Sequence, residues 1–412
     1  MRHQFQTPRA PTMNNTRRFA GTLLLSAATS CALFATNGDT LIGVGAKTRA
    51  MGGAGIAFSH GAESTLVNPA LITHVPDTEI SFGGTIFMPN VKTDIGPTGS
   101  TTESDADLSL IPAVAVVSQI RDNFYLGVGM WGTAGMGTDF RGNDRLMNME
   151  TTLQLMQFAV PVAYKLDGLS LGISPLIQYG SLDIHYESGM TGPVGDGQHQ
   201  DFGFGISAGL TYDFHNGFML GAMYKSKIEM NYGNSLSDAT APFTGLPGFP
   251  RGIGSRLDQP AEFGIGLGWR SGSHGIAIDW RRVQWSHAAG YEQFNWNDQD
   301  IFALGYQYDA GTWSARIGIN HGNNPVREAS GTTPGGAALN MFNLLGFPAT
   351  VETHLTAGGS YRFSKNFSAD LTAAYAFEKK TEGDISGLFG PGAKIKNSHT
   401  QLGTTVQLNY SF

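Results

Sequence analysis

Hydrophobic and polar residues alternate along most of this 412-residue chain. In FGFGISAGLTYDF (residues 202–214), large apolar side chains share one face, and Gly, Ser, Thr and Asp share the other. WSARIGIN (313–320) and FSADLTAAYAF (367–377) repeat the pattern. A period of two residues is typical of a β-strand with two different faces. About fourteen such runs are predicted, at 79–90, 108–120, 123–134, 151–166, 168–186, 202–215, 217–231, 259–271, 274–286, 300–309, 312–321, 352–363, 366–378 and 398–412.

The links between these runs alternate in length. Short turns are expected at 121–123, 165–168, 215–217, 271–274, 309–311 and 364–366, with longer loops between them. Short turns on one side and long loops on the other are typical of an outer-membrane barrel, and an even strand number places both chain ends in the periplasm. The sequence therefore predicts an all-β fold, a 14-stranded antiparallel transmembrane β-barrel that occupies residues 79–412.

Composition agrees with a barrel whose outer face meets lipid. Charged residues make up 14% of the chain, against roughly 25% in an average soluble domain, and there are 56 glycines. After the first residues no apolar run is long enough for a helical span. The net charge of -7 offers no basic face for nucleic acid.

Residues 1–35 are expected to be an N-terminal extension and a signal peptide. Arg17 and Arg18 precede the apolar run 19–34, and small residues follow near Ala35. Cys31 is the only cysteine. A lipoprotein site there is the less favoured alternative, because no large aliphatic residue precedes it where one is expected. The mature chain would then contain neither a disulfide nor a thiol nucleophile.

Residues 36–78 are expected to form a hatch, or plug, inside the lumen. The stretch GAKTRAMGGAGIAFSHGAESTLVNPALI (45–72) consists mostly of small residues without a helical stripe or strand alternation, so it cannot form a core of its own. Glycines allow close packing of its backbone against a barrel wall, and Asn-Pro favours a turn. The residues assigned to the hatch are Gly52, Gly53, Gly55, Asn68 and Pro69.

Several segments together resemble the FadL family of outer-membrane long-chain fatty acid and hydrocarbon transporters. They are RAMGGAGIAFSHGAESTLVNPALI (49–72), YLGVGMWGTAGMGTDF (125–140), QDIFALGYQYDAGTWSARIGINHGNNPV (299–326) and THLTAGGSYRFSKNFSADLTAAYAF (353–377). The resemblance implies a monomeric 14-stranded barrel with an internal hatch that passes hydrophobic molecules without its own energy source. It also implies capture at an external groove, transfer to a deeper pocket, and exit sideways through a gap at a kinked third strand.

This assignment implies a Gram-negative outer-membrane location, no enzymatic activity and no cofactor or metal. The expected partners are fatty acids, alkanes or aromatics, and the lipid and lipopolysaccharide around the barrel. Phe412 ends the last strand with an aromatic residue, as outer-membrane barrels do for recognition by their assembly machinery.

Apolar residues in the loops and the third strand are candidates for ligand binding, because exposed apolar loops suggest a capture site. The alternative is that the loops fold over one another as a lid. Glycines in the third strand can mark a kink, or reflect crowding by a plug. The ligand candidates are Trp131, Met136, Phe140, Phe243, Leu246, Phe249, Phe342, Leu345 and Phe347, and the kink candidates are Gly129, Gly132 and Gly135.

Two arginines could meet a carboxylate head group in the lumen. By strand alternation Arg316 and Arg281 face inward, and Arg suits bidentate pairing with a carboxylate. Asp279 shares a face with Arg281 and could neutralise it, and Arg316 could instead form a structural pair. A fatty acid, an alkane and a monoaromatic therefore all remain open as ligands.

Three other functions compete with this interpretation. A general diffusion porin would show charged lumen ladders and no plug. An outer-membrane hydrolase needs a nucleophile with a base in reach, but the histidines lie near strand ends or loops without a serine motif, and none has metal-ligand spacing. An adhesin or phage receptor remains open as a side role. The histidines concerned are His185, His215, His274, His287, His321 and His354.

Overall fold

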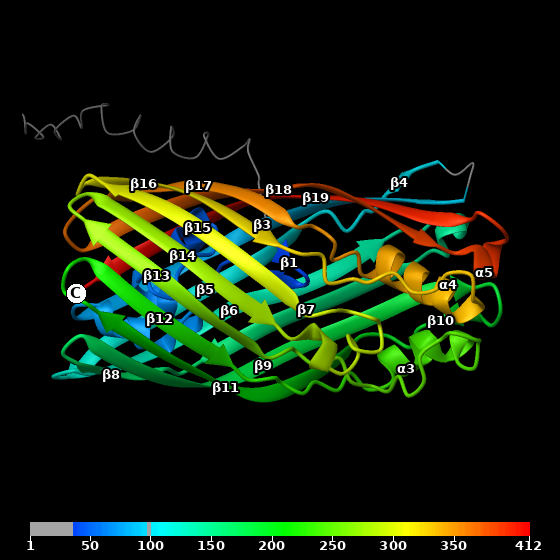
Figure 1. Cartoon of the computed structure of the whole chain (residues 1–412), viewed down its shortest axis with the longest axis horizontal. Coiled ribbons are helices and arrows are strands. Elements are labelled where there is room, and N and C mark those ends of the chain that lie inside the picture. Colours follow the sequence, from blue (N-terminus) through cyan, green and yellow to red (C-terminus); the bar gives the residue numbers. More distant parts are fainter. Residues whose placement is uncertain (1–35, 97–99) are drawn as a thin grey trace, which may run out of the picture. The chain divides into compact units, whose positions relative to one another are not determined.

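A computed structural model describes residues 36–96 and 100–412, so the predicted signal peptide lies outside the described residues. The described chain forms a closed antiparallel barrel of 14 strands (Figure 1). One of them is interrupted at Val160 and Pro161 and is counted as β7 plus β8. The wall consists of β3 (Thr78–Ile95), β5 (Ser109–Arg121), β6 (Phe124–Asp139), β7 (Glu150–Ala159), β8 (Val162–Leu166), β9 (Leu169–Ser188), β11 (His199–Asp213), β12 (Phe218–Lys225), β13 (Glu262–Ser271), β14 (His274–Val283), β15 (Gln299–Asp309), β16 (Trp313–Gly322), β17 (Thr353–Arg362), β18 (Phe367–Asp384) and β19 (Lys394–Ser411).

The barrel closes between its first and last wall strands. β19 pairs with β3 from Ser411 and Glu79 at one end to Ile395 and Ile95 at the other. Closure leaves no unpaired strand edge in the hydrocarbon, where each unsatisfied backbone group costs several kcal/mol. The predicted fold class is confirmed. Some predicted boundaries differ: β12 ends at Lys225 instead of 231, β18 continues to Asp384 instead of 378, and β6 continues to Asp139 although a loop was expected from 135.

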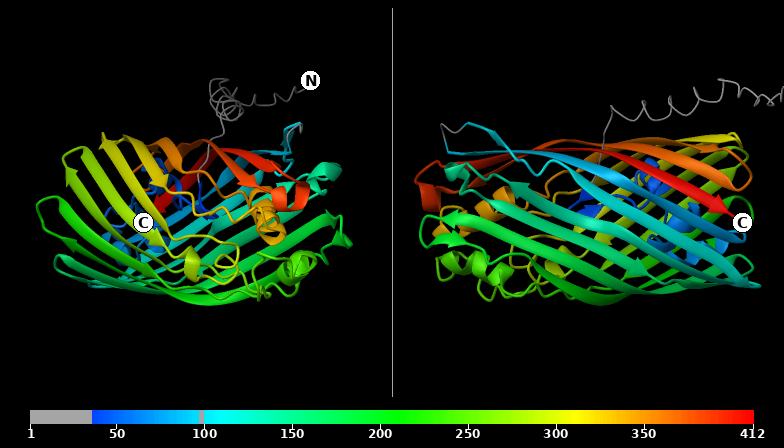
Figure 2. Two further views of the ribbon diagram at one scale, coloured as in Figure 1. Left: turned by 45° about the vertical axis from the view of Figure 1, so that its right-hand side comes forward. Right: turned by 180° about the vertical axis from the view of Figure 1, so that it is seen from behind.

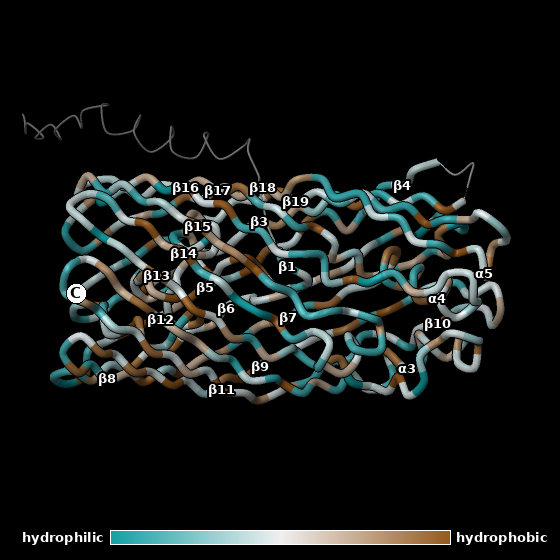
Figure 3. Tube along the Cα trace, viewed as in Figure 1, coloured by the Kyte–Doolittle hydropathy of each residue, from teal (hydrophilic) through white to brown (hydrophobic). Residues whose placement is uncertain are grey.

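The outer face is apolar, as the alternation predicts. Apolar and polar residues alternate along the strands in Figure 3, and outward side chains such as Phe204, Ile265 and Leu371 are exposed. Aromatic pairs gather near the short turns, which indicates the membrane interface. These pairs are Tyr212–Phe214, Phe218–Trp269, Tyr308–Trp313, Tyr361–Phe363 and Tyr410–Phe412.

The two ends of the barrel differ. Tight hairpin turns close one end, called here the turn end, and longer loops with short helices gather at the other, called the loop end (Figure 2). No helix within the described residues is long and apolar enough to cross a membrane. The loop-end elements are β4 (Thr102–Glu103), η4 (Asp144–Leu146), β10 (Gly192–Val194), α3 (Ser235–Thr240), η5 (Ala241–Phe243), η6 (Trp285–His287), α4 (Pro334–Met341), η7 (Phe342–Gly346) and α5 (Ser386–Phe389).

Residues 36–77, called here the N-terminal segment, run along the inner face of the wall. The hydroxyl of Thr73 donates to Ser170 on β9, and that of Thr372 on β18 donates to the Ala46 carbonyl. Contacts with strands on different sides of the barrel place the segment in the lumen. Its elements are β1 (Thr36–Asn37), β2 (Thr40–Leu41), α2 (Ala46–Ala50), η2 (Gly61–Leu66) and η3 (Pro69–His74).

Candidate functional site

The wall between β5 and β6 is open over part of its height. The two strands pair from Arg121 and Phe124 up to Ala113 and Trp131, and not beyond. Beyond this point, toward the end of the barrel that carries the longer loops, β6 shifts register against β7 between Gly132 and Ala134, as at a β-bulge. At the loop end the wall closes again, where the Asp105 N–H donates to the Asp139 carbonyl at 2.9 Å. We call this opening the wall window.

Beyond Trp131, the edge of β6 that faced β5 pairs with the N-terminal segment instead. Ala134 of β6 is opposite Thr40 of β2, and the Gly135 N–H donates to the Asp39 carbonyl at 3.0 Å. The free edge of β6 is therefore satisfied from inside the barrel. The third strand turns inward, which is the geometry that the family resemblance implies.

The wall window contains a cavity of about 480 Å³ lined without a single charged side chain. Leu110 of β5, 78% exposed, stands at its lipid side, and Leu41 and Met136 line it as well. A volume of this size falls within the range of small-molecule pockets. The lining suits an uncharged hydrophobic molecule.

The three kink glycines occupy different environments. A Cβ on Gly129 would lie 1.8 Å from the ring of Trp131, so the glycine leaves room for this buried indole below the window. A Cβ on Gly132 would lie 2.3 Å from Cγ2 of Ile111. At Gly135 only the Leu153 carbonyl oxygen comes within reach, at 3.1 Å, so the space at the window is open.

A second, small cavity of about 30 Å³ adjoins the window on the loop side. It shares Met136 with the window cavity. Pro348 and Ala349, which follow η7, line its other side together with His399. The cavity therefore lies between the loops and the window.

The loop candidates are packed together rather than exposed. Rings stack between Phe294 and Phe342, 4.9 Å apart, and Phe243 contacts Phe249. The expected exposure of these apolar loops is wrong for this conformation: the loops fold over one another, as in the alternative lid arrangement, because they bury apolar area that water would otherwise contact. Phe243, Phe249, Phe342, Leu345, Phe347, Trp131 and Phe140 are buried, and Leu246 and Met136 are half-buried.

Asp39 connects the N-terminal segment with the loops. Its buried carboxylate accepts a hydrogen bond from the Tyr291 hydroxyl at 2.5 Å and one from Gln259 at 3.2 Å. Burial raises the pKa of Asp39 above its ordinary value. Tyr291 packs with Trp285 and Trp296, with ring centroids 4.7 and 4.8 Å away. The residue whose carbonyl holds the β6 edge thus also contacts the loop cluster through its side chain.

The residues predicted for the hatch make close contacts with the wall and within the N-terminal segment. Gly52, at φ 70°, donates its N–H to Thr356 at 3.0 Å. The Gly55 N–H donates to Asp279 at 2.7 Å. The Asn68 side chain caps η3 at Ala70. In addition, a Cβ on Gly53 would collide with the Ile42 carbonyl, and Pro69 lies against Gly172.

The two predicted arginines both face the lumen and have different partners. Arg281 pairs with Glu262 at 3.1 Å. Asp279, considered as its partner, instead accepts the N–H groups of Gly55 and Ile56. Arg316 lines a cavity of about 710 Å³ at the turn end. Neither arginine lines the wall window.

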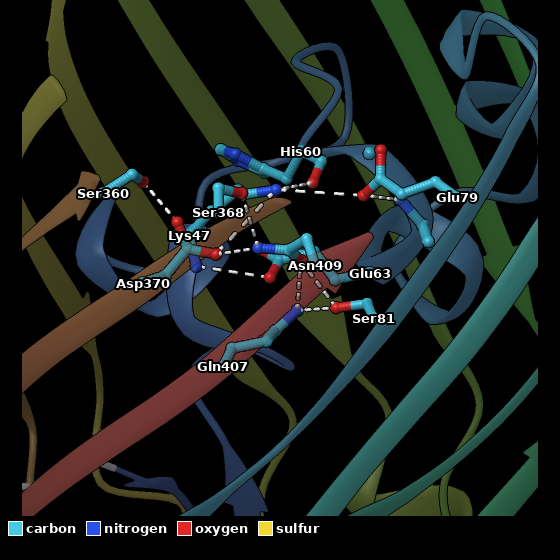
Figure 4. Close-up of polar contacts among 12 residues, drawn as sticks. Lys47, His60, Glu63, Glu79, Ser81, Ser360, Ser368, Asp370, Gln407 and Asn409 are labelled. Atoms are coloured by element: carbon cyan, nitrogen blue, oxygen red, sulfur yellow. Dashed lines mark hydrogen bonds and ion pairs between the residues drawn. The ribbon is translucent and has the colours of Figure 1, made fainter. Parts of the chain in front are cut away.

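A polar cluster ties the N-terminal segment to the wall (Figure 4). Lys47 lies 3.8 Å from Glu79 and 3.9 Å from Asp370. Glu63 accepts hydrogen bonds from the Thr48 N–H and hydroxyl, at 2.5 and 2.7 Å. Burial raises the pKa of Glu63 to about 7. Sequence reasoning did not single out these residues or Asp39; isolated charges in a stretch of small residues were the available signal.

The fold and the window define a class of protein, a membrane barrel with an inward-turned strand and an opening to the lipid. Residues 22–412 match the family described as outer membrane protein transport protein (OMPP1/FadL/TodX). The chain belongs to this family, and it is a β-barrel of the outer membrane. The family and its structural neighbours are transport channels rather than enzymes. Within the described residues no cluster of His, Cys, Asp and Glu has the arrangement of a metal site.

Individual relatives are distant in sequence. A 47 kDa outer membrane protein of Pasteurella multocida is 25% identical over 89% of this chain and 94% of its own length. The long-chain fatty acid transport protein of Escherichia coli is 24% identical over 82% and 86%. The crystal structure of a Pseudomonas aeruginosa FadL homologue has a TM-score of 0.70 at 17% identity, covering 91% of this chain and 100% of that one. The toluene transporter TodX of Pseudomonas putida has a TM-score of 0.67 at 18% identity, covering 92% and 100%.

Proposed function

We propose that this protein is a channel for passive uptake of hydrophobic compounds, which enter among the outer loops and leave sideways through the wall window. The uncharged cavity between β5 and β6 is the observation that carries this proposal. The small cavity beside Met136 offers the link from the loops. An apolar molecule that leaves through the window avoids the aqueous lumen below it.

The N-terminal segment acts as the hatch in this proposal. It supplies the partner for the free edge of β6 through Asp39 and Thr40. Displacing residues near Asp39 would release this edge and open the way between the loop cluster and the window. In the same proposal, residues 1–35 are a signal peptide that is removed on export, so the hatch stands at the start of the mature chain.

The proposed ligand class is a neutral hydrocarbon, with a long-chain fatty acid as the second candidate. Relatives named for both classes exist, the E. coli fatty acid transport protein and the P. putida toluene transporter. The absence of a charged side chain from the window lining favours a neutral molecule, because a carboxylate there would lack a partner.

Filling the window tests the route. Gly135→Phe places a ring where a Cβ meets only one backbone oxygen. In cells that rely on this protein for uptake of toluene or hexadecane, we expect uptake of these compounds to fall at least tenfold. Oleate uptake is measured in parallel. Gly189→Phe, at a loop-end turn where a Cβ meets nothing within 4 Å, is the matched control.

Two results would argue against the proposal. Unchanged hydrocarbon uptake by a correctly folded Gly135→Phe variant would exclude the window as the exit. Sustained large conductance of the unmodified protein in planar bilayers would favour the competing general diffusion porin.

A further inference from the structure

The cavity at the turn end lies outside the proposed route and has its own chemistry. Its volume is about 710 Å³, and its lining holds four basic residues, Lys and Arg, and four acidic ones. The basic residues are Lys47, Arg270, Arg316 and Arg362, and the acidic ones are Glu79, Asp213, Asp309 and Asp370. The formal charges of these eight side chains balance.

The carboxylates of the cavity already have partners. Lys47 lies between Glu79 and Asp370. Asp213 accepts the N–H of His215 at 2.8 Å, and Asp309 accepts the N–H of Gly311 at 2.8 Å, so both stabilise the hairpin turns in which they stand. The acidic groups are therefore engaged by Lys47 or by the turn backbone.

The three arginines, in contrast, are bound only by neutral groups. Arg316 donates through Nε to Gln307 at 2.7 Å and through Nη1 to Ser360 at 2.6 Å. Arg270 donates to the Ser59 carbonyl at 2.7 Å, and Arg362 donates to the Gly311 carbonyl at 2.6 Å. Among the described residues, none of these three arginines has a carboxylate oxygen within 4.0 Å, the limit for an ion pair.

Arg316 is the only one of the three arginines that is buried. Arg316 is only 9% exposed. Its Nη2 donates no hydrogen bond within the described part of the chain. Arg270 and Arg316 repel each other electrostatically, and Asp370 and Asp309 attract Arg316 from beyond ion-pair distance. A buried guanidinium without a directly paired charge is costly, and an anion between the two arginines would both pair with Arg316 and relieve the repulsion.

Arg270 lies over a buried ring at the edge of the cavity, because Phe58 is only 2% exposed. The guanidinium carbon of Arg270 lies 3.7 Å from the centre of the Phe58 ring, and Met219 and Phe218 contribute further lining. Arg matches the planar, bidentate geometry of a carboxylate. We propose that this cavity binds a singly charged carboxylate between Arg316 and Arg270.

Equilibrium binding to the purified full chain in a non-ionic detergent tests this proposal. Sodium octanoate, sodium acetate and octanol are titrated by calorimetry. Octanoate binding without acetate binding identifies a fatty carboxylate, and binding of both identifies a small free carboxylate; either supports the site. Octanol binding as tight as octanoate binding, or no carboxylate binding at all, overturns it.

Substitutions locate the binding. Arg316→Gln and Arg270→Gln should each weaken octanoate binding at least fivefold. Arg121→Gln, an exposed arginine at a turn of the same end but outside the cavity, should leave it unchanged. If Arg316→Gln fails to fold, as judged by heat-modifiable migration on gels, the exposed Arg270 still decides the test: unaltered binding by Arg270→Gln contradicts the proposal. Because binding is measured on purified protein, its outcome is separate from that of the uptake assay.

Discussion

The two halves of the lumen differ in the kind of side chain that fills them. At the loop end, buried aromatic and aliphatic side chains such as Trp285, Phe294 and Phe342 fill the interior. At the turn end, ion pairs and hydrogen bonds of Lys47 and Glu63 tie the N-terminal segment to the wall. A hydrophobic molecule would lose its apolar surroundings if it continued downward, and each buried hydrogen bond that it broke would cost about 1–3 kcal/mol. The wall window lies where the apolar half meets the N-terminal segment, so a sideways exit costs less.

The N-terminal segment itself spans this division. Its first residues contact the window and the loop aromatics through Asp39. Its later residues are held by many buried contacts with the wall, among them those of Gly52 and Gly55. We therefore expect residues 36–44 to move during transport and residues 45–77 to stay docked.

The largest effect should come from removing the segment altogether. Deleting residues 36–75 should leave a folded barrel, because the wall closes through β19 and β3 without them. The polar lumen would then open to water, and ion conductance in planar bilayers should rise at least tenfold. A barrel that fails to assemble would contradict the expectation that the wall folds without the segment. One that assembles and conducts no more than the full chain would show that the segment is not what closes the lumen.

The wall was predictable from sequence, whereas the contacts inside it were not. Strand alternation depends on neighbours two residues apart, and it located segments such as 202–215 and 312–321 to within a few residues. The glycines of β6 indicated a kink for a local reason, since they weaken a strand. The partner of the freed edge, Asp39 and Thr40, lies about ninety residues away in sequence, and no local pattern announces such a pairing.

The apolar loop residues illustrate the same limit. Their composition correctly indicated an apolar half, but whether Phe342 faces water or Phe294 depends on how separate loops pack together. The partner of Arg281 could not be predicted for the same reason. Strand alternation places Asp279 on the same face as Arg281, but Asp279 accepts from Gly55 of the N-terminal segment, and Arg281 pairs with Glu262 on the neighbouring strand.

A disulfide across the edge of the window should have an intermediate effect. A Cβ at position 132 would lie 3.5 Å from Cβ of Ile111, within the range for a disulfide. If the window has to widen, Ile111→Cys combined with Gly132→Cys should lower hydrocarbon uptake about fivefold under oxidation, and reductant should restore it.

The matched control joins the same two strands where they are paired. Val116 and Val128 face each other across β5 and β6, so Val116→Cys combined with Val128→Cys should leave uptake unaltered. Equal uptake by oxidised and reduced forms of the window variant would mean that the existing opening suffices without any widening of the strands.

The smallest effect should be a dependence of hatch docking on pH through Glu63. Burial raises the pKa of Glu63 from 4.5 to about 7 in the docked segment, so the docked state binds the proton more tightly than the released one. Docking is therefore weakest above about pH 7, gains stability as the pH falls toward about 4.5, and gains no more below it. In the docked segment burial holds the pKa of His60 well below its ordinary value of 6.5, so protonation of His60 in the released segment opposes the effect of Glu63 below about pH 6.5.

The change should be only about twofold in leakage of a small sugar from proteoliposomes between about pH 8 and about pH 5, because Lys47 keeps its ion pairs with Glu79 and Asp370 and holds the segment docked. Glu63→Gln retains an oxygen that can accept from Thr48 but cannot titrate, so its leakage should no longer fall as the pH is lowered. If leakage of the variant still fell as the pH was lowered, the titration would belong to another group of the polar half. If leakage of the unmodified protein rose as the pH fell, His60 would outweigh Glu63.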